Sequence, residues 1–284
     1  MKTVVNLPGL RQVISDWKKH GNRIAFVPTM GNLHDGHLTL LEKAREISDR
    51  SVVSIFVNPI QFGKGEDYEN YPSTLEADGK KLRSSKLDLL FTPDLKELYP
   101  GGVDADTRVN VPGLSTILCG KFRPDHFSGV ATVVTKLLIN VTPDYALFGE
   151  KDYQQLLVIR RLVYDLCIPT EIIGMPIVRE ADGLAMSSRN GYLNQKQRRL
   201  APVIYKTLQA AATKLHKRQA DIVSIETEGM LALESAGLRP EYFSVRRTSD
   251  LGESGPEDRG LSILTAAWLG PARLIDNIKV VMDQ

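Results

Sequence analysis

The sequence contains little cysteine: its 284 residues include only Cys119 and Cys167, which are far apart and have no paired spacing. This pattern argues against a disulfide framework or a structural zinc site, and it favours a reduced environment. Long hydrophobic runs are also lacking, since no stretch approaches the roughly 18 to 20 apolar residues of a membrane span. The start of the chain has no signal-peptide pattern. We therefore expect a cytoplasmic protein with no membrane partner.

The sequence also lacks an excess of charge of one sign. The chain has 36 Lys and Arg against 34 Asp and Glu, a net charge of +2. Such a protein has no large uniform field to hold DNA or RNA through counterion release, so we expect no nucleic-acid partner. Internal repeats, low-complexity tracts and long charge runs are absent from the sequence. The remaining composition, 42% hydrophobic and 25% charged, is that of a globular protein with one large domain or two.

The first half of the sequence alternates strand and helix patterns. Short apolar runs typical of strands lie at 23–27, 51–57, 87–92 and 145–148. Helical patterns begin at Leu38 and at the possible capping box Ser73-Thr74-Leu75-Glu76, and an apolar helix is expected over 130–141. Strands that alternate with helices predict an α/β fold with a doubly wound parallel sheet.

The second half has a different order of elements. It predicts two long helices, at 194–218 and 222–237, and then three strands, at 242–247, 261–269 and 272–281. Consecutive strands without intervening helices indicate an antiparallel sheet. We therefore expect a first domain over 1–176 and a second, smaller α+β domain over 177–284.

The segment FVPTMGNLHDGH, at 26–37, carries the strongest functional signal. A strand pattern ends in a glycine-containing turn, and His34 and His37 lie on either side of Gly36 at the start of an amphipathic helix. Such a helix start attracts phosphate through its backbone N–H groups and its dipole, and two imidazoles add hydrogen-bond donors. Two surface histidines in a turn would give the same pattern, whereas a zinc site would lack a third ligand.

A second segment, AMSSRN at 185–190, follows a glycine-containing turn. Its two hydroxyls and the guanidinium of Arg189 suit a clamp for a triphosphate, although a loop of small polar residues is more often simply solvated. Together with the histidine segment, it resembles the HIGH and KMSKS signatures of the nucleotidyltransferase superfamily. Members of that superfamily activate carboxylates or phosphates at the α-phosphate of ATP.

Two further segments follow strand patterns, FVNPIQF at 56–62 and FGEKDYQQ at 148–155. The carboxyl ends of parallel strands meet at one edge of a sheet, where ligands of such folds bind. Gln61 and Gln155 offer amide hydrogen bonds to a small polar substrate, although each alone also fits a loop cap. Lys151, beside an aspartate, fits either a phosphate contact or a solvated ion pair.

With these segments, the chain resembles the pantothenate synthetase (pantoate–β-alanine ligase) family over essentially its whole length. The resemblance rests on PTMGNLHDGH, FVNPIQF, YPSTLEAD, KFRPDHFSGV, FGEKDYQQ and AMSSRNGYL. It implies a Rossmann-type amino-terminal domain, a smaller carboxyl-terminal lid domain and a homodimer. It also implies that pantoate and β-alanine are condensed through a pantoyl adenylate, with ATP and a divalent metal, usually Mg2+, and with release of AMP and pyrophosphate.

The resemblance further implies roles for individual residues. His37 would be the proton donor, and His34, Lys151 and Arg189 would stabilise the reacting phosphate. The ATP site would comprise Met30, Gly31, Asn32, Leu33, His34, Asp35, Gly36, His37, Gly149, Glu150, Lys151, Asp152, Val178, Met186, Ser187, Ser188 and Arg189. The resemblance leaves the metal ligands unknown.

Pantoate would be bound by Gln61 and Gln155, with Gln61 also near β-alanine. Because recognition of hydroxyl and carboxylate groups by two glutamines is not unique to pantoate, alternatives stay open. One is a nucleotidyltransferase that leaves AMP on another small product. A small aminoacyl-tRNA synthetase is disfavoured by the absence of a basic stripe, and a non-catalytic ATP sensor is disfavoured by the intact histidine and arginine positions.

Overall fold

The computed structural model describes residues 1–63, 65–255 and 257–282. The chain divides into two compact units. The first comprises Met1–Glu150 and Gln155–Pro176, and the second comprises Ile177–Gln284 together with the short segment Lys151–Gln154. Within the described ranges, every helix is too short or too polar to reach across a lipid bilayer.

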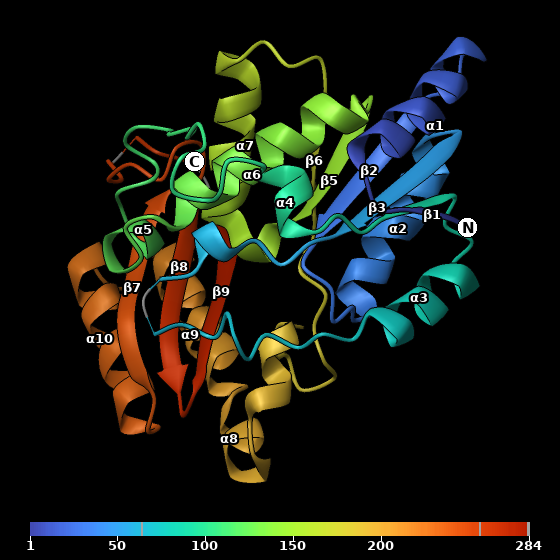
Figure 1. Ribbon diagram of the computed structural model, residues 1–284. Coiled ribbons are helices and arrows are strands. Elements are labelled where there is room, and N and C mark those ends of the chain that lie inside the picture. The colour runs from blue at the N-terminus through green and yellow to red at the C-terminus, as the bar shows by residue number, and fades with distance from the viewer. Residues whose placement is uncertain (64, 256, 283–284) are drawn as a thin grey trace. The chain divides into compact units, whose positions relative to one another are not determined.

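A six-stranded parallel sheet forms the centre of the first unit (Figure 1). Its strands are β1 (Lys2–Val4), β2 (Ile24–Thr29), β3 (Arg50–Ile55), β4 (Leu89–Phe91), β5 (Tyr145–Gly149) and β6 (Glu171–Met175). Their order is β1-β4-β3-β2-β5-β6, so the chain runs from β2 to β4 on one side and from β5 to β6 on the other. The topological switch lies between β2 and β5, and the doubly wound sheet expected from the sequence is confirmed.

Helices cover both faces of this sheet (Figure 1). One face carries α2 (Asp35–Ile47) and α3 (Leu75–Ser84); the other carries α1 (Leu7–Lys19), α6 (His126–Val141) and α7 (Tyr153–Asp165). The connections include the short helices α4 (Leu95–Leu98) and α5 (Cys119–Phe122) and the single 3-10 turns η1 (Pro59–Gln61) and η2 (Glu150–Asp152). Fully buried Ala25 and Val27 of β2 pack with Leu41 and Ala44 of α2, so the sheet and α2 share one core.

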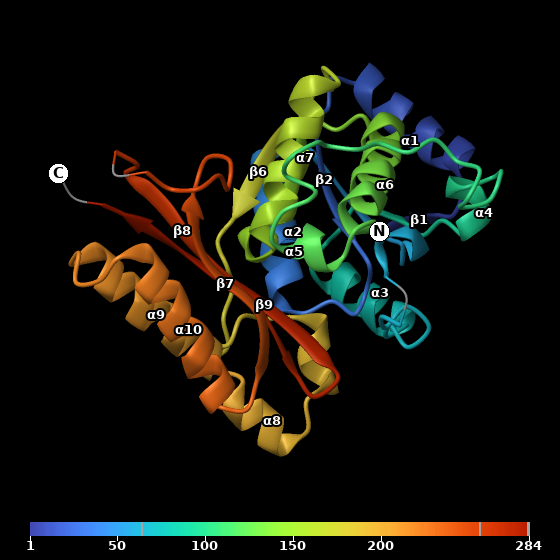
Figure 2. The same cartoon turned by 90° about the vertical axis from the view of Figure 1, so that its left-hand side faces the viewer.

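The second unit contains an antiparallel sheet of β7 (Arg239–Arg247), β8 (Gly260–Leu269) and β9 (Ala272–Val281), in that order. The helices α9 (Val203–His216) and α10 (Ile222–Ser235) lie side by side over one face of it (Figure 2). Buried Leu208 and Leu233 of these helices join Phe243 and Ile263 of the sheet in one core. The α+β architecture expected after residue 177 is therefore present.

Two expected local features are wrong. The helix expected over 194–218 is two helices, α8 (Gln195–Leu200) and α9, because Pro202 lacks the N–H that a continuous helix would need at that point. The capping box expected at Ser73 does not form, since the residue that caps α3 is Thr74 and it makes no side-chain cap bond. The Thr74 hydroxyl instead donates to Asp78 Oδ2 at 3.0 Å.

Candidate functional site

The connection from β2 to α2 contains the two histidines of the first motif. Gly31 and Asn32 have positive φ angles of 85° and 50°, which turn the chain sharply after the strand. His34 is the N-cap of α2, and its backbone N–H donates to His37 Nδ1 at 3.3 Å. The two imidazole rings lie 4.1 Å apart between centroids. Because Nδ1 of His37 accepts a hydrogen bond, a neutral His37 carries its hydrogen on Nε2 and can donate from that atom.

Helix α3 holds this turn from the neighbouring side. Asp78, only 1% exposed, accepts the backbone N–H groups of Asn32 at 2.8 Å and of Leu33 at 2.9 Å. Lys81 Nζ donates to the backbone carbonyl of Leu33 at 2.5 Å. Helix α3 thus fixes the turn after β2 through one acceptor, Asp78, and one donor, Lys81.

The connection after β3 places Gln61 beside the first motif. Gln61 is 9% exposed, and its Nε2 lies 2.8 Å from Met30 Sδ. Asn58 Nδ2 donates to Gln61 Oε1 at 3.3 Å and to the carbonyl of Gly129 at 3.0 Å. Buried Tyr99 in turn donates its hydroxyl to Asn58 Oδ1 at 2.9 Å, so the Gln61 amide rests on a chain of buried polar groups.

The backbone of Gln61 is held as well. Its carbonyl lies 2.8 Å from His126 Nδ1 and accepts from the guanidinium of Arg123 at 3.2 Å. Arg123 also pairs with Glu66, with Nε at 2.6 Å from Oε1. Burial alone would raise the pKa of Glu66, but the hydrogen bonds and charge of Arg123 outweigh it, so the pKa lies below its usual value.

The third segment follows β5, the strand next to β2 on its other side. Gly149 ends this strand and Glu150 begins the 3-10 turn after it. The turns after β2, β3 and β5 therefore leave neighbouring strands at one sheet edge, next to the topological switch. Gln155 lies in the first turn of α7, which continues from the same connection.

The AMSSRN segment belongs to the second unit. The backbone N–H of Met186 donates to the carbonyl of Val178 at 3.0 Å, which brings these two expected ATP-site residues together. Ser187 caps the 3-10 helix η3 (Ser188–Tyr192) by accepting the backbone N–H of Arg189 at 3.3 Å. The segment is therefore an ordered turn held against residue 178.

Lys151 is anchored to the same unit. Its backbone carbonyl accepts from Asn277 Nδ2 at 3.0 Å, and its side chain lines a small cavity with Ser187 and Asp276. Asp276 accepts two hydrogen bonds from Arg179, at 2.6 and 3.0 Å. Burial raises the pKa of Asp276, and the charges of Arg179 and Lys151 oppose that rise.

A metal cage is not evident in the part of the chain that the structure describes. Within it, no group of three or more His, Cys, Asp or Glu side chains is arranged to hold a metal ion. Mg2+ usually binds through substrate phosphates and one or two carboxylates, which needs no such cage.

Comparison with known proteins identifies the family. The family model described as pantoate-beta-alanine ligase matches residues 2–279. The chain belongs to this family. It is 53% identical to the pantothenate synthetase of Pseudomonas aeruginosa (strain UCBPP-PA14) over 283 residues, which span 100% of each chain.

Solved structures of pantoate–β-alanine ligases agree with this assignment. The pantothenate synthetase of Thermus thermophilus matches with a TM-score of 0.91 and 44% identity, over 98% of this chain and 99% of that one. A Francisella tularensis pantoate-beta-alanine ligase, named as complexed with beta-gamma ATP and beta-alanine, matches with a TM-score of 0.82 and 37% identity. That match covers 98% of this chain and 97% of the Francisella chain.

Several polar residues that hold the candidate site residues in place were not singled out from the sequence. Asp78 and Asn58 stand inside family motifs, but nothing in those motifs says what they contact. Asp276 has a visible signal, because it stands at the same alternate positions of the strand at 272–281 as Ala272 and Leu274, where a charge needs a partner. Asn277 beside it has no such signal, since amides are tolerated in many strands.

Proposed function

We propose that this chain condenses pantoate with β-alanine, using ATP, and so forms pantothenate, AMP and pyrophosphate. The observation that carries the proposal is the turn of His34 and His37 at the switch point of the sheet, in a chain that matches the ligase family throughout. The Francisella relative, named as complexed with beta-gamma ATP and beta-alanine, supports the same substrates.

The first step joins pantoate to AMP. A pantoate carboxylate oxygen attacks the α-phosphorus, the bond to the bridging oxygen breaks, and pyrophosphate leaves. The carboxylate is already ionised at neutral pH, so this step needs positioning and charge neutralisation rather than a general base. His37 donates from Nε2 to the reacting phosphate, and His34, Lys151 and Arg189 stabilise the charge that develops there.

ATP binding involves three groups of residues in this proposal. Met30 to His37 line the ATP site, Gly149 to Asp152 hold ribose and phosphate, and Val178 with Met186 to Arg189 complete the nucleotide pocket. Mg2+ bound to ATP would neutralise the charge of the phosphates, and such an ion usually needs only one or two protein carboxylates.

The second step forms the amide bond. The amine nitrogen of β-alanine attacks the acyl carbon, the bond to the AMP oxygen breaks, and the nitrogen loses a proton. Gln61 and Gln155 hold pantoate, and Gln61 also lies near β-alanine. The carboxyl-terminal domain over 177–284 serves as a lid that keeps water from the acyl adenylate.

A half-reaction assay tests this mechanism. With ATP, Mg2+ and pantoate alone, the protein should form enzyme-held adenylate and pyrophosphate, and AMP should appear only after β-alanine is added. Absence of both early products from a folded preparation would rule out the adenylate step. A stable adenylylated product without AMP release would instead favour a nucleotidyltransferase acting on another small substrate.

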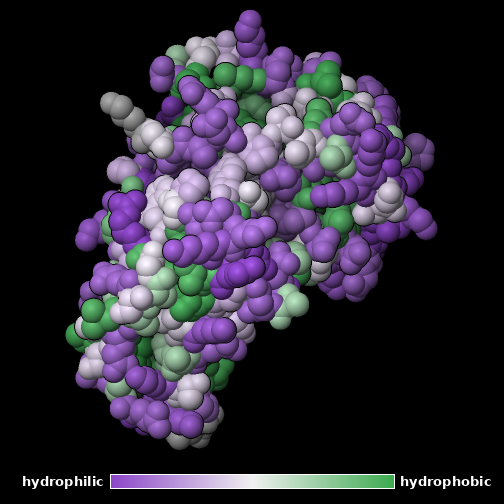
Figure 3. Space-filling model, turned by 90° about the horizontal axis from the view of Figure 1, so that it is seen from below, coloured by the Kyte–Doolittle hydropathy of each residue, from purple (hydrophilic) through white to green (hydrophobic). Residues whose placement is uncertain are grey.

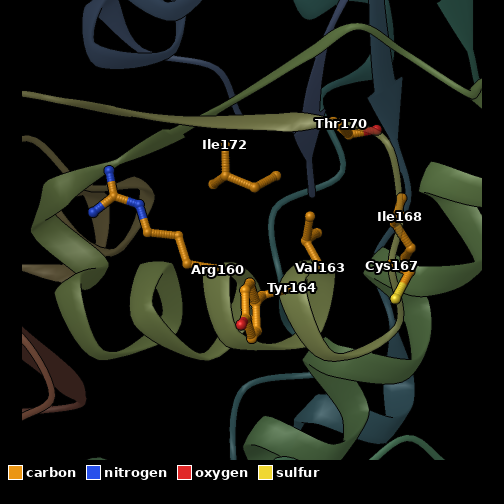
Figure 4. Close-up of a pocket in the computed structure, with 7 residues that line it drawn as sticks. All are labelled: Arg160, Val163, Tyr164, Cys167, Ile168, Thr170 and Ile172. Carbon is orange, nitrogen blue, oxygen red and sulfur yellow. The ribbon is translucent and has the colours of Figure 1, made fainter.

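The protein's setting and assembly complete the proposal. The protein acts in the reducing cytoplasm in this proposal, in keeping with a sequence that has only two cysteines. We also propose a homodimer. Its interface would include the outer edge of β6 and an open groove of about 580 Å³ beside the carboxyl-terminal half of α7, where Tyr164 is 80% exposed (Figure 4).

A further inference from the structure

Asp78 is a buried carboxylate that does not reach the outside of the molecule. It lies on α3, is 1% exposed, and takes no part in the chemistry described above. Its Oδ2 accepts from the Asn32 N–H at 2.8 Å and from the Thr74 hydroxyl at 3.0 Å, and its Oδ1 accepts from the Leu33 N–H at 2.9 Å. All three of these hydrogen bonds converge on one carboxylate, and two of them come from the turn before His34.

The shape of that turn explains why a carboxylate lies there. Gly31 and Asn32 both have positive φ angles, 85° and 50°, and the turn they make aims the N–H groups of Asn32 and Leu33 at one carboxylate. Such a concavity binds an anion. Here Asp78 occupies it from within the protein, so a phosphate of ATP must meet the motif further on, at His34, His37 and the first turn of α2.

Two neighbouring contacts make the arrangement rigid. Lys81, one helical turn after Asp78, donates to the Leu33 carbonyl at 2.5 Å. Both the backbone N–H and the backbone carbonyl of Leu33 are therefore held by α3. A Cβ at Gly31 would lie 3.3 Å from Asp78 Oδ2 and 3.1 Å from Ile55 Cγ2. The turn therefore fits closely between α3 and the end of β3.

We propose that Asp78 and Lys81 are positioning residues that set the placement of the His34 and His37 imidazoles toward ATP. They act through the backbone of Asn32 and Leu33 and do not touch the substrate. This inference rests on the proposed ligase function for its kinetic consequences, but the geometry of the turn is a property of the chain itself.

The test uses three variants of the full-length protein. Asp78→Asn keeps the size of the side chain but replaces one accepting oxygen with a donor, which leaves a turn N–H unsatisfied. Lys81→Met keeps the apolar stem and removes only the donor to Leu33. Asp88→Asn is the matched control, because Asp88 also accepts a backbone N–H, that of Ser51 at 2.8 Å, but at the opposite end of the sheet.

Kinetic and spectroscopic readouts separate positioning from mere stability. Asp78→Asn and Lys81→Met should lower kcat/KM for ATP in pantoate-dependent ATP–pyrophosphate exchange by up to about 100-fold, because displacements near 1 Å can cost that much. The KM for β-alanine should stay unchanged. Asp88→Asn should lower the thermal unfolding midpoint by a comparable amount and leave the rate of ATP–pyrophosphate exchange normal. The ¹⁵N chemical shifts of the His37 ring should change in the first two variants only. The chain has five histidines, so the spectrum contains few ring signals to assign.

Each outcome of these measurements either supports or overturns the positioning role of Asp78 and Lys81. If Asp78→Asn fails to fold, Lys81→Met carries the test. Wild-type exchange rates together with unmoved His37 shifts in the folded variants would overturn the inference, as would equal kinetic losses in Asp88→Asn. A wild-type protein without any exchange would overturn the ligase function instead, while the ring shifts would still report on the positioning role.

Discussion

At the scale of single residues, Gly129 determines how closely α6 approaches the 3-10 turn η1, which contains Gln61. A Cβ at this position would lie 2.6 Å from the Gln61 nitrogen and 2.7 Å from the Ile60 carbonyl carbon, which are backbone atoms that cannot rotate away. The carbonyl of Gly129 also accepts from Asn58. Because Gly129 has no Cβ, α6 can approach the turn at Gln61 closely enough for the hydrogen bond from Asn58 to the Gly129 carbonyl.

We predict that Gly129→Ala displaces Gln61. The clash should lower the free energy of unfolding by about 1 to 3 kcal/mol, as overpacking does. It should also raise the KM for pantoate by about 10-fold or more, because the Gln61 amide moves with its backbone. Steady-state kinetics and denaturant titration measure both effects. Ser128→Ala, at the adjacent helix position, should change neither, and an unchanged pantoate KM in folded Gly129→Ala would refute the prediction.

A second residue-scale prediction concerns pH. The pKa of Glu66 is lowered in the folded protein, despite burial, by Arg123, from an ordinary value of 4.5. A carboxyl of this kind stabilises the fold fully above its unfolded pKa, and the contribution is lost as pH falls through the folded pKa. Glu66→Gln should therefore lower the free energy of unfolding by about 1.5 to 3 kcal/mol at pH 7, the contribution of a hydrogen bond to a charged group.

The difference between wild type and Glu66→Gln should shrink as the pH falls below 4.5, and urea titrations from pH 7 to pH 3 would show it. Glu253→Gln serves as the control, since Glu253 is 94% exposed and lies 4.0 Å from Arg246. Exposed pairs of this kind contribute little. A pH-independent difference for Glu66→Gln would contradict the assignment.

At the scale of elements, strand β9 joins two parts of the expected ATP site. Its Asp276 holds Arg179, which also donates to the Gly183 carbonyl at 3.1 Å at the turn before the AMSSRN segment. Its Asn277 holds the backbone of Lys151. Lys151 and the turn that precedes the AMSSRN segment are therefore supported by two successive residues of one strand.

We predict that Asp276→Asn disturbs ATP use beyond its effect on stability. Removing one charge of a buried pair should cost about 3 to 5 kcal/mol of unfolding free energy. Displacement of Arg179 and of the turn that it holds should raise the KM for ATP by about 10-fold or more. Glu241→Gln is a matched control in the same sheet, where Glu241 accepts from Arg273 at 2.7 and 2.9 Å. Equal ATP kinetics in the two variants would mean that Asp276 has only a structural role.

The elements also show how far the sequence could predict the structure. Strands such as β2 and β5 and helices such as α6 were expected because apolar periodicity is local. The doubly wound topology followed from their alternation, and family membership followed from contiguous motifs. The first helix, α1, was not expected, although its cap at Asn6 and its early proline are recognisable signals.

The site was predictable where chemistry resides in adjacent residues and not where it depends on distant contacts. His34 and His37 lie three positions apart, so their pairing is visible in the sequence. Asp78 contacts a backbone nitrogen 45 residues earlier, and Asp276 pairs with an arginine 97 residues earlier. Each is an ordinary polar residue until the fold brings its partner to it, and no local pattern contains that information.

At the scale of the whole molecule, the distribution of hydrophobic residues on the surface bears on assembly. The face drawn in Figure 3 is mostly hydrophilic, with hydrophobic residues in small groups. The groove beside β6 differs, because it combines exposed Tyr164 with Ile168 and Ile172 (Figure 4). β6 is also the last strand of its sheet, and an outer strand presents unpaired backbone groups to a partner.

These features predict self-association through the β6 edge. A two-fold axis would pair β6 with its own copy in antiparallel orientation and bring the same patch from both chains together. Arg160 and Arg161 lie near Asp165 and Glu171 in sequence, so the patch contains both signs and suits an identical partner. Tyr164→Glu should weaken the dimer by about 30-fold in Kd, the equivalent of about 2 kcal/mol at an interface anchor.

Sedimentation equilibrium at micromolar concentrations would measure this dissociation, with Leu231→Glu as the control. Leu231 is 56% exposed on α10, outside the proposed interface, so its replacement should leave the dimer intact. A monomeric wild type would refute self-association altogether. A wild-type dimer that Tyr164→Glu does not weaken would place the interface elsewhere, because a carboxylate buried against its own copy repels that copy and lacks a compensating partner.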